Sequence, residues 1–287
     1  MPKKNQIIED ALANSSNRRS LLKKLAVAGA AAGVAGIPAR AQSPTAVDVV
    51  QFALNLEYLE AEFYSLAVLG QTLEQRGIPI SGSGIPGPTT TAYGKVAFVN
   101  NLVLTAASAK DTMDDETAHV IVLRTALMAN GVTPVAKPAI NLDALAPLGA
   151  SLANQQAYLV LVRAFEDIGV SAYNGGAPLL SGSPYLSTAA RILSVEGEHA
   201  ANIRLQIARL GIPIPPLDGA DVVPPPAGSN MFSTNKANGL SAVRTPGQVL
   251  YLAYGNKANA TSGGFFPNGV NGTINMSSGP ATADALN

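Results

Sequence analysis

The chain has 287 residues, 19 basic and 19 acidic side chains, and no cysteine. Without cysteine it has no disulfide and no thiolate metal site, so any transition metal must be held by histidine and carboxylate groups. The first 41 residues carry seven of the basic and two of the acidic residues, which leaves 12 basic and 17 acidic residues beyond them. A mildly acidic chain without a basic run argues against nucleic acid as a partner, because binding phosphates needs a basic patch.

The N-terminal segment, residues 1–41, has the pattern of a twin-arginine signal peptide. Arg18 and Arg19 precede an alanine- and glycine-rich apolar stretch at 25–37, and a small-x-small cleavage site follows at 39–41. A membrane anchor is the alternative, but this apolar stretch is too short for a hydrocarbon core that needs about 20 residues. We therefore predict export to the periplasm or the extracellular space, with membrane contact only during export.

Four long segments with helical periodicity follow the leader and predict an all-α four-helix bundle over residues 46–212. We expect these helices at about 46–70, 94–130, 151–175 and 187–210. Gly131, Gly175 and Gly211 stand where glycines end helices. Residues 77–88, rich in Gly, Pro and Ser, predict a long surface loop between the first two helices.

The C-terminal extension, residues 213–287, is dense in Gly, Pro, Asn and Ser and cannot bury much apolar surface by itself. One stretch differs from the rest. Thr245 is a good N-cap and Pro246 a good first helical residue, which predicts a short fifth helix at 246–254. We expect the remainder to wrap the bundle in irregular structure.

Both histidines of the chain follow a glutamate by three residues, as Glu116-x-x-His119 and Glu196-x-x-His199. Positions i and i+3 share one face of an α-helix, so each pair can direct a carboxylate and an imidazole to one point. This arrangement is the Glu-x-x-His device of di-iron and di-manganese helix bundles.

Each predicted long helix carries one glutamate within its apolar face: Glu57, Glu116, Glu166 and Glu196. Burying an ionised carboxylate without a partner costs several kcal/mol, and four would exceed the roughly 5 to 15 kcal/mol that keeps a domain folded. Among basic residues, only Arg163 is close enough to one of them, Glu166, to be considered as a partner. Two divalent or trivalent cations would neutralise all four acids and take both imidazoles as ligands.

Other interpretations of these residues are weaker. A bundle that has lost its metal is the alternative for the six residues together. The His-x-x-x-His spacing of the zincins does not occur, and the 77–88 loop lacks the Lys-Ser/Thr of a phosphate-binding loop.

A second regularity involves two tyrosines. Tyr64 follows Glu57 by seven residues, and Tyr173 follows Glu166 by seven. Since the order Glu…Tyr and then Glu-x-x-His occurs twice, the chain resembles the ferritin-like superfamily, and it matches the rubrerythrin and ferritin ligand pattern at all six positions. Residues 55–64, 244–246 and 263–269 are similar to the exported ferritin-like family that includes plant desiccation-related proteins. The resemblance covers about 48–272.

The resemblance implies a role for each residue of the pattern. Glu57 and Glu166 would be terminal ligands of one metal each, Glu116 and Glu196 would bridge, and His119 and His199 would each cap one metal. The cofactor would be two Fe ions, with two Mn ions as the alternative. Tyr64 and Tyr173 would hydrogen-bond a ligand carboxylate, and ordinary core packing is the alternative for both.

The remaining acids near the motifs are expected to be less important. Glu60 lies one turn from Glu57 at the edge of the inward face, and we favour a surface acid over an extra ligand or a proton relay. We expect Glu62 and Glu198 to be solvated, and Asp114 and Asp115 to be surface charges. Tyr64, Tyr173 and Glu60 are thus the candidates for a catalytic role beside the ligands.

Three functions remain open from the sequence. We favour a di-iron or di-manganese oxidoreductase of the ferroxidase, peroxidase or catalase type, which would oxidise Fe²⁺ or consume peroxide or dioxygen in stress protection. An iron-binding or storage protein would need a cage of many subunits, which the long loop and the C-terminal extension would crowd. A structural or desiccation-protective envelope protein would use metal only to stabilise the bundle. A homo-oligomer is compatible with each of the three.

Overall fold

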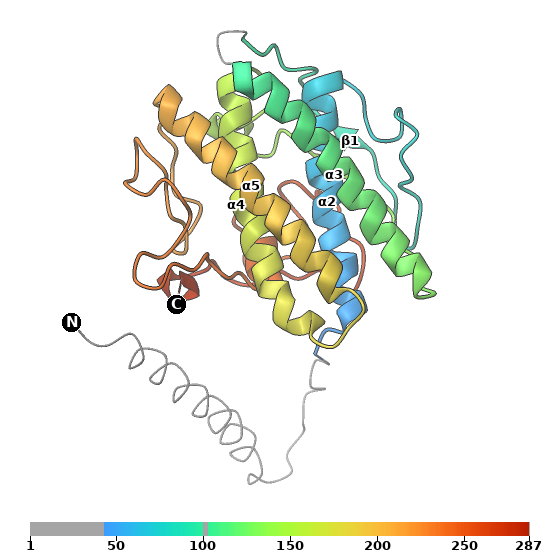
Figure 1. The fold of residues 1–287 in the computed structure, drawn as a ribbon. Helices are drawn as coiled ribbons and strands as arrows, with labels where there is room; N and C mark the ends of the chain where they lie inside the picture. The colour runs from blue at the N-terminus through green and yellow to red at the C-terminus, as the bar shows by residue number, and fades with distance from the viewer. Residues whose placement is uncertain (1–42, 100–102, 287) are drawn as a thin grey trace, which may run out of the picture. The chain divides into compact units, whose positions relative to one another are not determined.

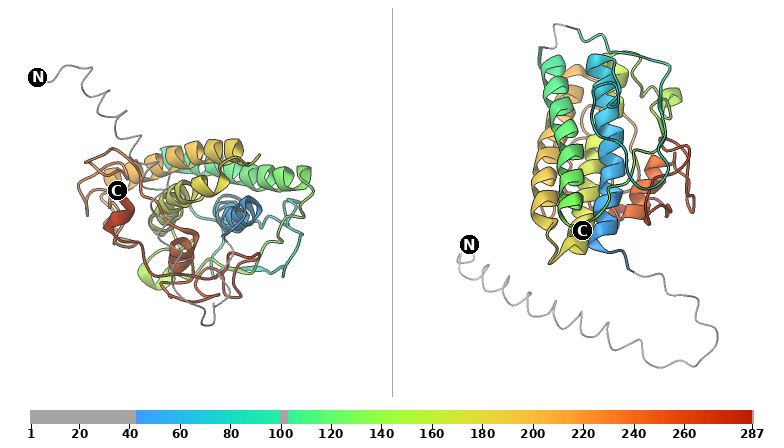
Figure 2. Two further views of the ribbon diagram at one scale, coloured as in Figure 1. Left: turned by 90° about the horizontal axis from the view of Figure 1, so that it is seen from below. Right: turned by 90° about the vertical axis from the view of Figure 1, so that its right-hand side faces the viewer.

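Four long helices dominate the computed structural model, which describes residues 43–99 and 103–286 (Figure 1). They are α2 (Ala46–Leu69), α3 (Val103–Ala129), α4 (Gln155–Gly176) and α5 (Leu186–Leu210). α2 packs along α3, and α4 packs along α5. In the two views of Figure 2, α3 and α5 form one layer of the bundle, and α2 and α4 form the other. The predicted all-α bundle is confirmed.

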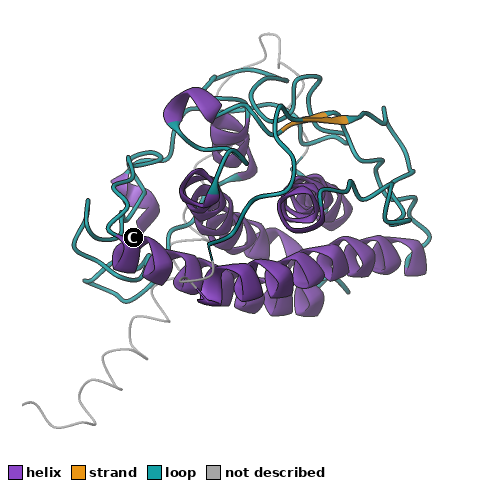
Figure 3. Ribbon diagram, turned by 90° about the horizontal axis from the view of Figure 1, so that it is seen from above, coloured by secondary structure: helices purple, strands orange, loops and turns teal. Residues whose placement is uncertain are grey.

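The shorter elements connect and cover the long helices. Strand β1 (Thr89–Thr90) pairs in parallel with β2 (Ile140–Asn141), with Thr89 opposite Ile140. The other short elements are α6 (Pro246–Ala253) and three 3-10 turns, η1 (Ala146–Leu148), η2 (Ala177–Leu180) and η3 (Ala283–Leu286). Figure 3 shows the strand pair and many of the loops on the α2/α4 side of the bundle.

The predicted signal peptide at 1–41 lies outside the described residues. Within the residues that are described, no helix combines the length and the apolar character needed to cross a membrane.

Local sequence signals determine where several helices begin and end. At the start of α2, the Thr45 side chain accepts a hydrogen bond from the backbone N–H of Asp48, whose carboxylate accepts one from the Thr45 N–H. The short helix α6 begins in the same way, with Thr245 as N-cap, Pro246 as its first residue and Gln248 as the reciprocal partner. Such capping boxes satisfy backbone donors that a helix leaves unpaired at its first turn.

Two predicted helix starts were too early. Residues 94–99 are not helical, because the Val96 N–H donates to the Ala67 carbonyl (2.8 Å) and the Val99 N–H donates to the Gln155 side chain (2.9 Å). These bonds hold the segment against α2 and α4. Helix α4 begins at Gln155 instead of 151, because the Asn154 side chain accepts a hydrogen bond from the backbone N–H three residues further on and caps the helix.

Gly175 does not end the third long helix as predicted. Gly131 and Gly211 have left-handed φ angles of 72° and 63° at the ends of α3 and α5, but Gly175 lies inside α4. A Cβ at this position would clash with the carbonyl oxygen of Arg244 in the C-terminal extension. Gly175 is therefore a site of close backbone approach, which is another use of glycine.

The C-terminal extension is tied to the bundle by hydrogen bonds. Asn271 and Asn55 of α2 pair twice, since the Asn271 N–H donates to Asn55 Oδ1 (3.0 Å) and Asn55 Nδ2 donates to the Asn271 carbonyl (2.9 Å). The Asn271 side chain accepts from the Ile85 N–H (2.8 Å) and donates to the carbonyls of Ile85 (3.0 Å) and Ala136 (2.8 Å). Asn271 thus links α2 to the α2–α3 connection at Ile85 and to the α3–α4 connection at Ala136.

Replacing Asn271 by alanine is expected to lower the free energy of unfolding by about 1–3 kcal/mol, because three backbone groups lose their partner at once. Urea unfolding measures this change. The exposed Asn268 provides the control, since Asn268→Ala should stay within about 0.5 kcal/mol of the parent protein. Equal stability of the two variants would show that the extension is held in another way.

Candidate metal centre

The six residues of the Glu-x-x-His pattern come together inside the bundle. Each long helix contributes at least one: Glu57 lies on α2, Glu116 and His119 on α3, Glu166 on α4, and Glu196 and His199 on α5. All four glutamates are fully buried, and the two histidines are 6% and 7% exposed. The convergence predicted from helix faces is present in the structure.

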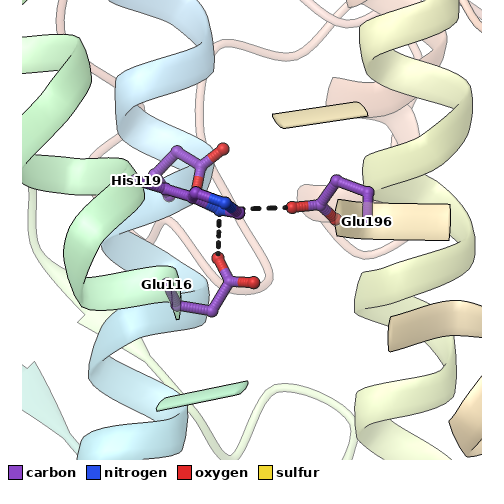
Figure 4. Close-up of side chains that lie close together, drawn as sticks. Glu116, His119 and Glu196 are labelled. Atoms are coloured by element: carbon purple, nitrogen blue, oxygen red, sulfur yellow. Dashed lines mark hydrogen bonds and ion pairs between the residues drawn. The ribbon is translucent and has the colours of Figure 1, made fainter. Parts of the chain in front are cut away.

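The first cluster of donor atoms surrounds His119. Its Nδ1 lies 3.2 Å from Glu57 Oε2, 3.3 Å from Glu116 Oε2 and 3.6 Å from Glu196 Oε1. Figure 4 shows His119 with Glu116 of the same helix on one side and Glu196, which approaches from α5, on another. One donor atom from each of these four residues lies within 4.8 Å of the others.

The second cluster surrounds His199 and shares one residue with the first. Its Nδ1 lies 3.1 Å from Glu116 Oε1 and 3.3 Å from Glu166 Oε2. Glu116 therefore directs one oxygen to each cluster, as a bridging carboxylate would. Glu196 belongs to the first cluster only among the described residues, and a bridging role for Glu196 stays a prediction.

Several buried atoms of the two clusters make no well-oriented hydrogen bond among the described residues and face one another instead. They are Glu57 Oε2, Glu116 Oε1, Glu166 Oε2, both carboxylate oxygens of Glu196 and His199 Nδ1. Leaving one such atom unpaired is costly, and charged groups are the most costly of all. These atoms are oxygens and an imidazole nitrogen, a donor set that suits iron and manganese. These groups can bind metal, and the chemistry of the donors fits two neighbouring ions.

In the protein without metal, the buried carboxylates raise the pKa values of the two histidines. Burial opposes the charged form of both imidazoles, but the charge of Glu57 and a bond to Glu116 raise the pKa of His119 to about 11. The charge of Glu166 and a bond to Glu116 raise the pKa of His199 to about 12. Two protonated imidazoles thus supply the positive charge when metal is absent.

The pKa values of the carboxyl groups differ because their neighbours differ. Burial raises the pKa of Glu57 to about 7, and burial together with the charges of the other carboxylates raises that of Glu196 well above its usual value. Burial also acts on Glu116, but the close contacts with both histidines outweigh it and lower the pKa of this carboxyl to about 2. Glu116, the shared residue, therefore stays ionised.

The two tyrosines of the sequence pattern hold the terminal glutamates in a crossed arrangement. The Tyr64 hydroxyl of α2 donates a hydrogen bond to Glu166 Oε1 of α4, and the Tyr173 hydroxyl of α4 donates one to Glu57 Oε1 of α2. In each case the other oxygen of the carboxylate faces the donor cluster. Each tyrosine thus orients a glutamate on the opposite helix.

Asp115 is a functional candidate that sequence reasoning treated as a surface charge. Its side chain is 52% exposed, but Oδ2 lies 3.2 Å from Nε2 of His199, on the ring edge opposite the cluster. A carboxylate in this position fixes the orientation of the imidazole. The only available sequence signal is its place beside Glu116, because its partner is 84 residues away.

Two expected surface acids are buried instead. Glu60 is 5% exposed, so the surface role favoured from the sequence is wrong, and its oxygens belong to neither cluster. Burial and four nearby carboxylates raise its pKa well above the usual value. Glu62 is fully buried and pairs with Lys137 at 3.4 Å, so it is not solvated. Glu198 and Asp114 are exposed, as expected.

Arg163 does not compensate the glutamates. Its Nε lies 2.8 Å from Asp167, one turn further along α4, and its Nη2 donates to Asp221 of the C-terminal extension. Arg163, which the sequence offered as a partner for Glu166, therefore pairs with two aspartates instead.

The chain is similar to known proteins. Residues 45–209 match the model of the ferritin-like domain. The chain is also 26% identical over 273 residues to the ferritin-like catalase Nec2 of Nesocodon mauritianus, an alignment that covers 79% of this chain and 84% of the relative. The domain match spans more than half of the chain and includes the whole of α2, α3 and α4 and nearly all of α5. This chain belongs to the ferritin-like domain family.

Proposed function

We propose that the chain is an oxidoreductase that holds two Fe or two Mn ions and consumes peroxide, with dioxygen or Fe²⁺ as the other candidate substrates. The observation that carries the proposal is the convergence of buried carboxylate and imidazole donor atoms into two neighbouring groups that share Glu116. Similarity to a protein named a ferritin-like catalase supports peroxide among these substrates. Two such ions held side by side supply paired electron changes, the chemistry that peroxide consumption requires.

The residues of the chain would have separate tasks in this centre. Glu57, Glu116, His119 and Glu196 would hold one ion, and Glu116, Glu166 and His199 the other. Tyr64 and Tyr173 keep the terminal carboxylates turned toward the clusters, and Asp115 keeps His199 in place. The buried apolar surroundings keep bulk water away, which strengthens electrostatic interactions inside.

Peroxide consumption by metal-loaded protein tests the proposal. Protein loaded with Fe or with Mn should release dioxygen from hydrogen peroxide or oxidise an added reductant with it, and Glu57→Ala should lose at least about 100-fold of this rate. Glu198→Ala, an exposed glutamate two residues from Glu196, should retain the rate. Metal-loaded protein that consumes neither peroxide nor dioxygen and oxidises no Fe²⁺ would refute the proposal.

A purely structural role for the metal is the second candidate. It is favoured by the burial of four carboxylates close together, because ions that neutralise them would stabilise the bundle even without turnover. In that case metal removal should lower the melting temperature strongly while no substrate is consumed. Iron storage would instead require many copies in one assembly, which sedimentation would reveal.

We also infer that the protein is exported by the twin-arginine route. The support is the Arg18-Arg19 pair with the apolar stretch and cleavage site that follow. Replacing both arginines by lysine is expected to keep the protein in the cytoplasm of a bacterium that has this pathway, because the export machinery reads the arginine pair itself. Cell fractionation measures the effect, and Lys23→Arg is the matched control that should still be exported. Unchanged export of the double variant would mean that another route is used.

A further inference from the structure

A pocket lies between α2 and α4 on the side of the bundle that the extension covers. Its volume is about 120 Å³, and most of its walls are apolar. Helices α2 and α4 form the inner part. The rest is formed by α6, residues 214–217, Leu145, Leu148, Ala150, Asn256 and Phe265. Its lining includes the exposed Leu148 and Asn256, so the pocket opens to solvent.

The inner part of the pocket reaches the metal centre at Glu60 and Gly169. Glu60 is 5% exposed and makes no hydrogen bond or ion pair with any described residue. A Cβ at Gly169 would clash with Glu196 Oε2 and would lie 3.5 Å from Glu60 Oε1. The absent side chain at Gly169 therefore brings the pocket wall directly against a carboxylate of the first cluster.

We propose that this pocket binds a small uncharged molecule, about the size of one aromatic ring, whose hydrogen-bond donor meets the carboxyl group of Glu60. The volume is close to that of a cavity of about 150 Å³ that binds benzene. An acid with no partner inside an apolar pocket is the place where a ligand hydroxyl gains most.

Charge selects against anions at this position. Glu60 lies at the inner end, and Arg163, the one cation in the described lining, is held by Asp167 and Asp221. Gly169 forms the wall between the pocket and Glu196, so one glycine would separate a bound molecule from a residue of the metal centre. An effect of the bound molecule on the metal centre rests on the proposed function, whereas its binding to the pocket does not.

Phenol is a suitable probe because it combines one ring with one hydroxyl donor. Calorimetric titration of the metal-loaded protein should show phenol binding, and benzoate, which has the same ring with a negative charge, should bind at least tenfold more weakly. Ala164→Phe fills the pocket from α4 and should weaken phenol binding at least tenfold. Ala172→Phe is the matched control, since it lies on the same helix but lines a separate cavity of about 30 Å³ beside Tyr173.

Two further variants keep the test decisive. Val160→Phe narrows the pocket at a half-buried position and replaces Ala164→Phe if that variant does not fold. Glu60→Leu removes the acceptor and should abolish the preference for phenol over toluene. Failure of the wild-type protein to bind phenol, equal affinity in the pocket-filling and control variants, or equal affinity for benzoate would each overturn the proposal.

The rate of peroxide consumption tests separately whether a molecule in the pocket affects the metal centre. Phenol should change the rate of peroxide consumption by the wild-type protein and by Ala172→Phe, but should have no effect on Ala164→Phe. If phenol binds and the rate stays the same, the pocket is not part of the reaction path. If the wild-type protein consumes no peroxide, the proposed function fails while the binding result stands.

Discussion

Replacing Glu116 by alanine is expected to leave less than one metal ion per chain, whereas replacing Glu166 should leave about one. Glu116 directs an oxygen to each of the two donor clusters, so its loss weakens both, but Glu166 belongs to the second cluster only. Mutation of a residue that only contacts a metal ligand typically lowers metal affinity by about 10 to 100-fold. Loss of a direct ligand should therefore lower the affinity by more than about 100-fold. Elemental analysis of each purified variant measures the ion content.

The same experiment decides the role of Glu196. Bridging by this residue, as the family resemblance implies, predicts that Glu196→Ala behaves like Glu116→Ala. If Glu196 belongs to the first cluster alone, Glu196→Ala should retain about one ion. The exposed Glu198 supplies the control on the same helix, and Glu198→Ala should keep the full ion content. Equal ion content in the Glu116 and Glu166 variants would contradict the shared position of Glu116.

Metal affinity is expected to fall about 100-fold for each ion when the pH is lowered from 8 to 6. Without metal, the pKa values of His119 and His199 are about 11 and 12, so both imidazoles are protonated throughout this range. Each must lose its proton to bind metal, and one displaced proton changes the affinity about tenfold per pH unit. Glu57, with a pKa of about 7, adds to the dependence for the first cluster.

Titration with Mn²⁺ at several pH values, in buffers with different heats of ionisation, measures both the affinity and the number of protons released. His199→Gln should retain the ion of the first cluster and release at least one proton fewer than the parent protein. Affinity that is the same at pH 6 and pH 8 would show that the imidazoles are already neutral before metal binds.

The helices and the face of each helix that carries the six residues could be predicted from the sequence, because they depend on short-range spacing. A glutamate three residues before a histidine shares its helix face whatever surrounds it. The helix ends at Gly131 and Gly211 depend on the backbone of one residue in the same way. Such features need no knowledge of distant parts of the chain.

The errors concern positions whose surroundings come from distant segments. Glu62 lies away from the ligand face of α2 but is buried, because Lys137 and the covering connections enclose that side of the helix. Gly175 looks like a helix end, but its role depends on Arg244, almost 70 residues later. The importance of Asp115 depends on a histidine of another helix. Helical periodicity cannot show what covers a helix from outside.

The crossed tyrosines have a consequence for the order of assembly. The α2–α3 hairpin carries Glu57 and Tyr64, the α4–α5 hairpin carries Glu166 and Tyr173, and each tyrosine orients the glutamate of the other hairpin. Neither hairpin by itself contains a finished set of oriented ligands. Insertion of the ions would therefore have to follow the docking of the two halves, so a loaded protein would be one whose chain has already completed its fold.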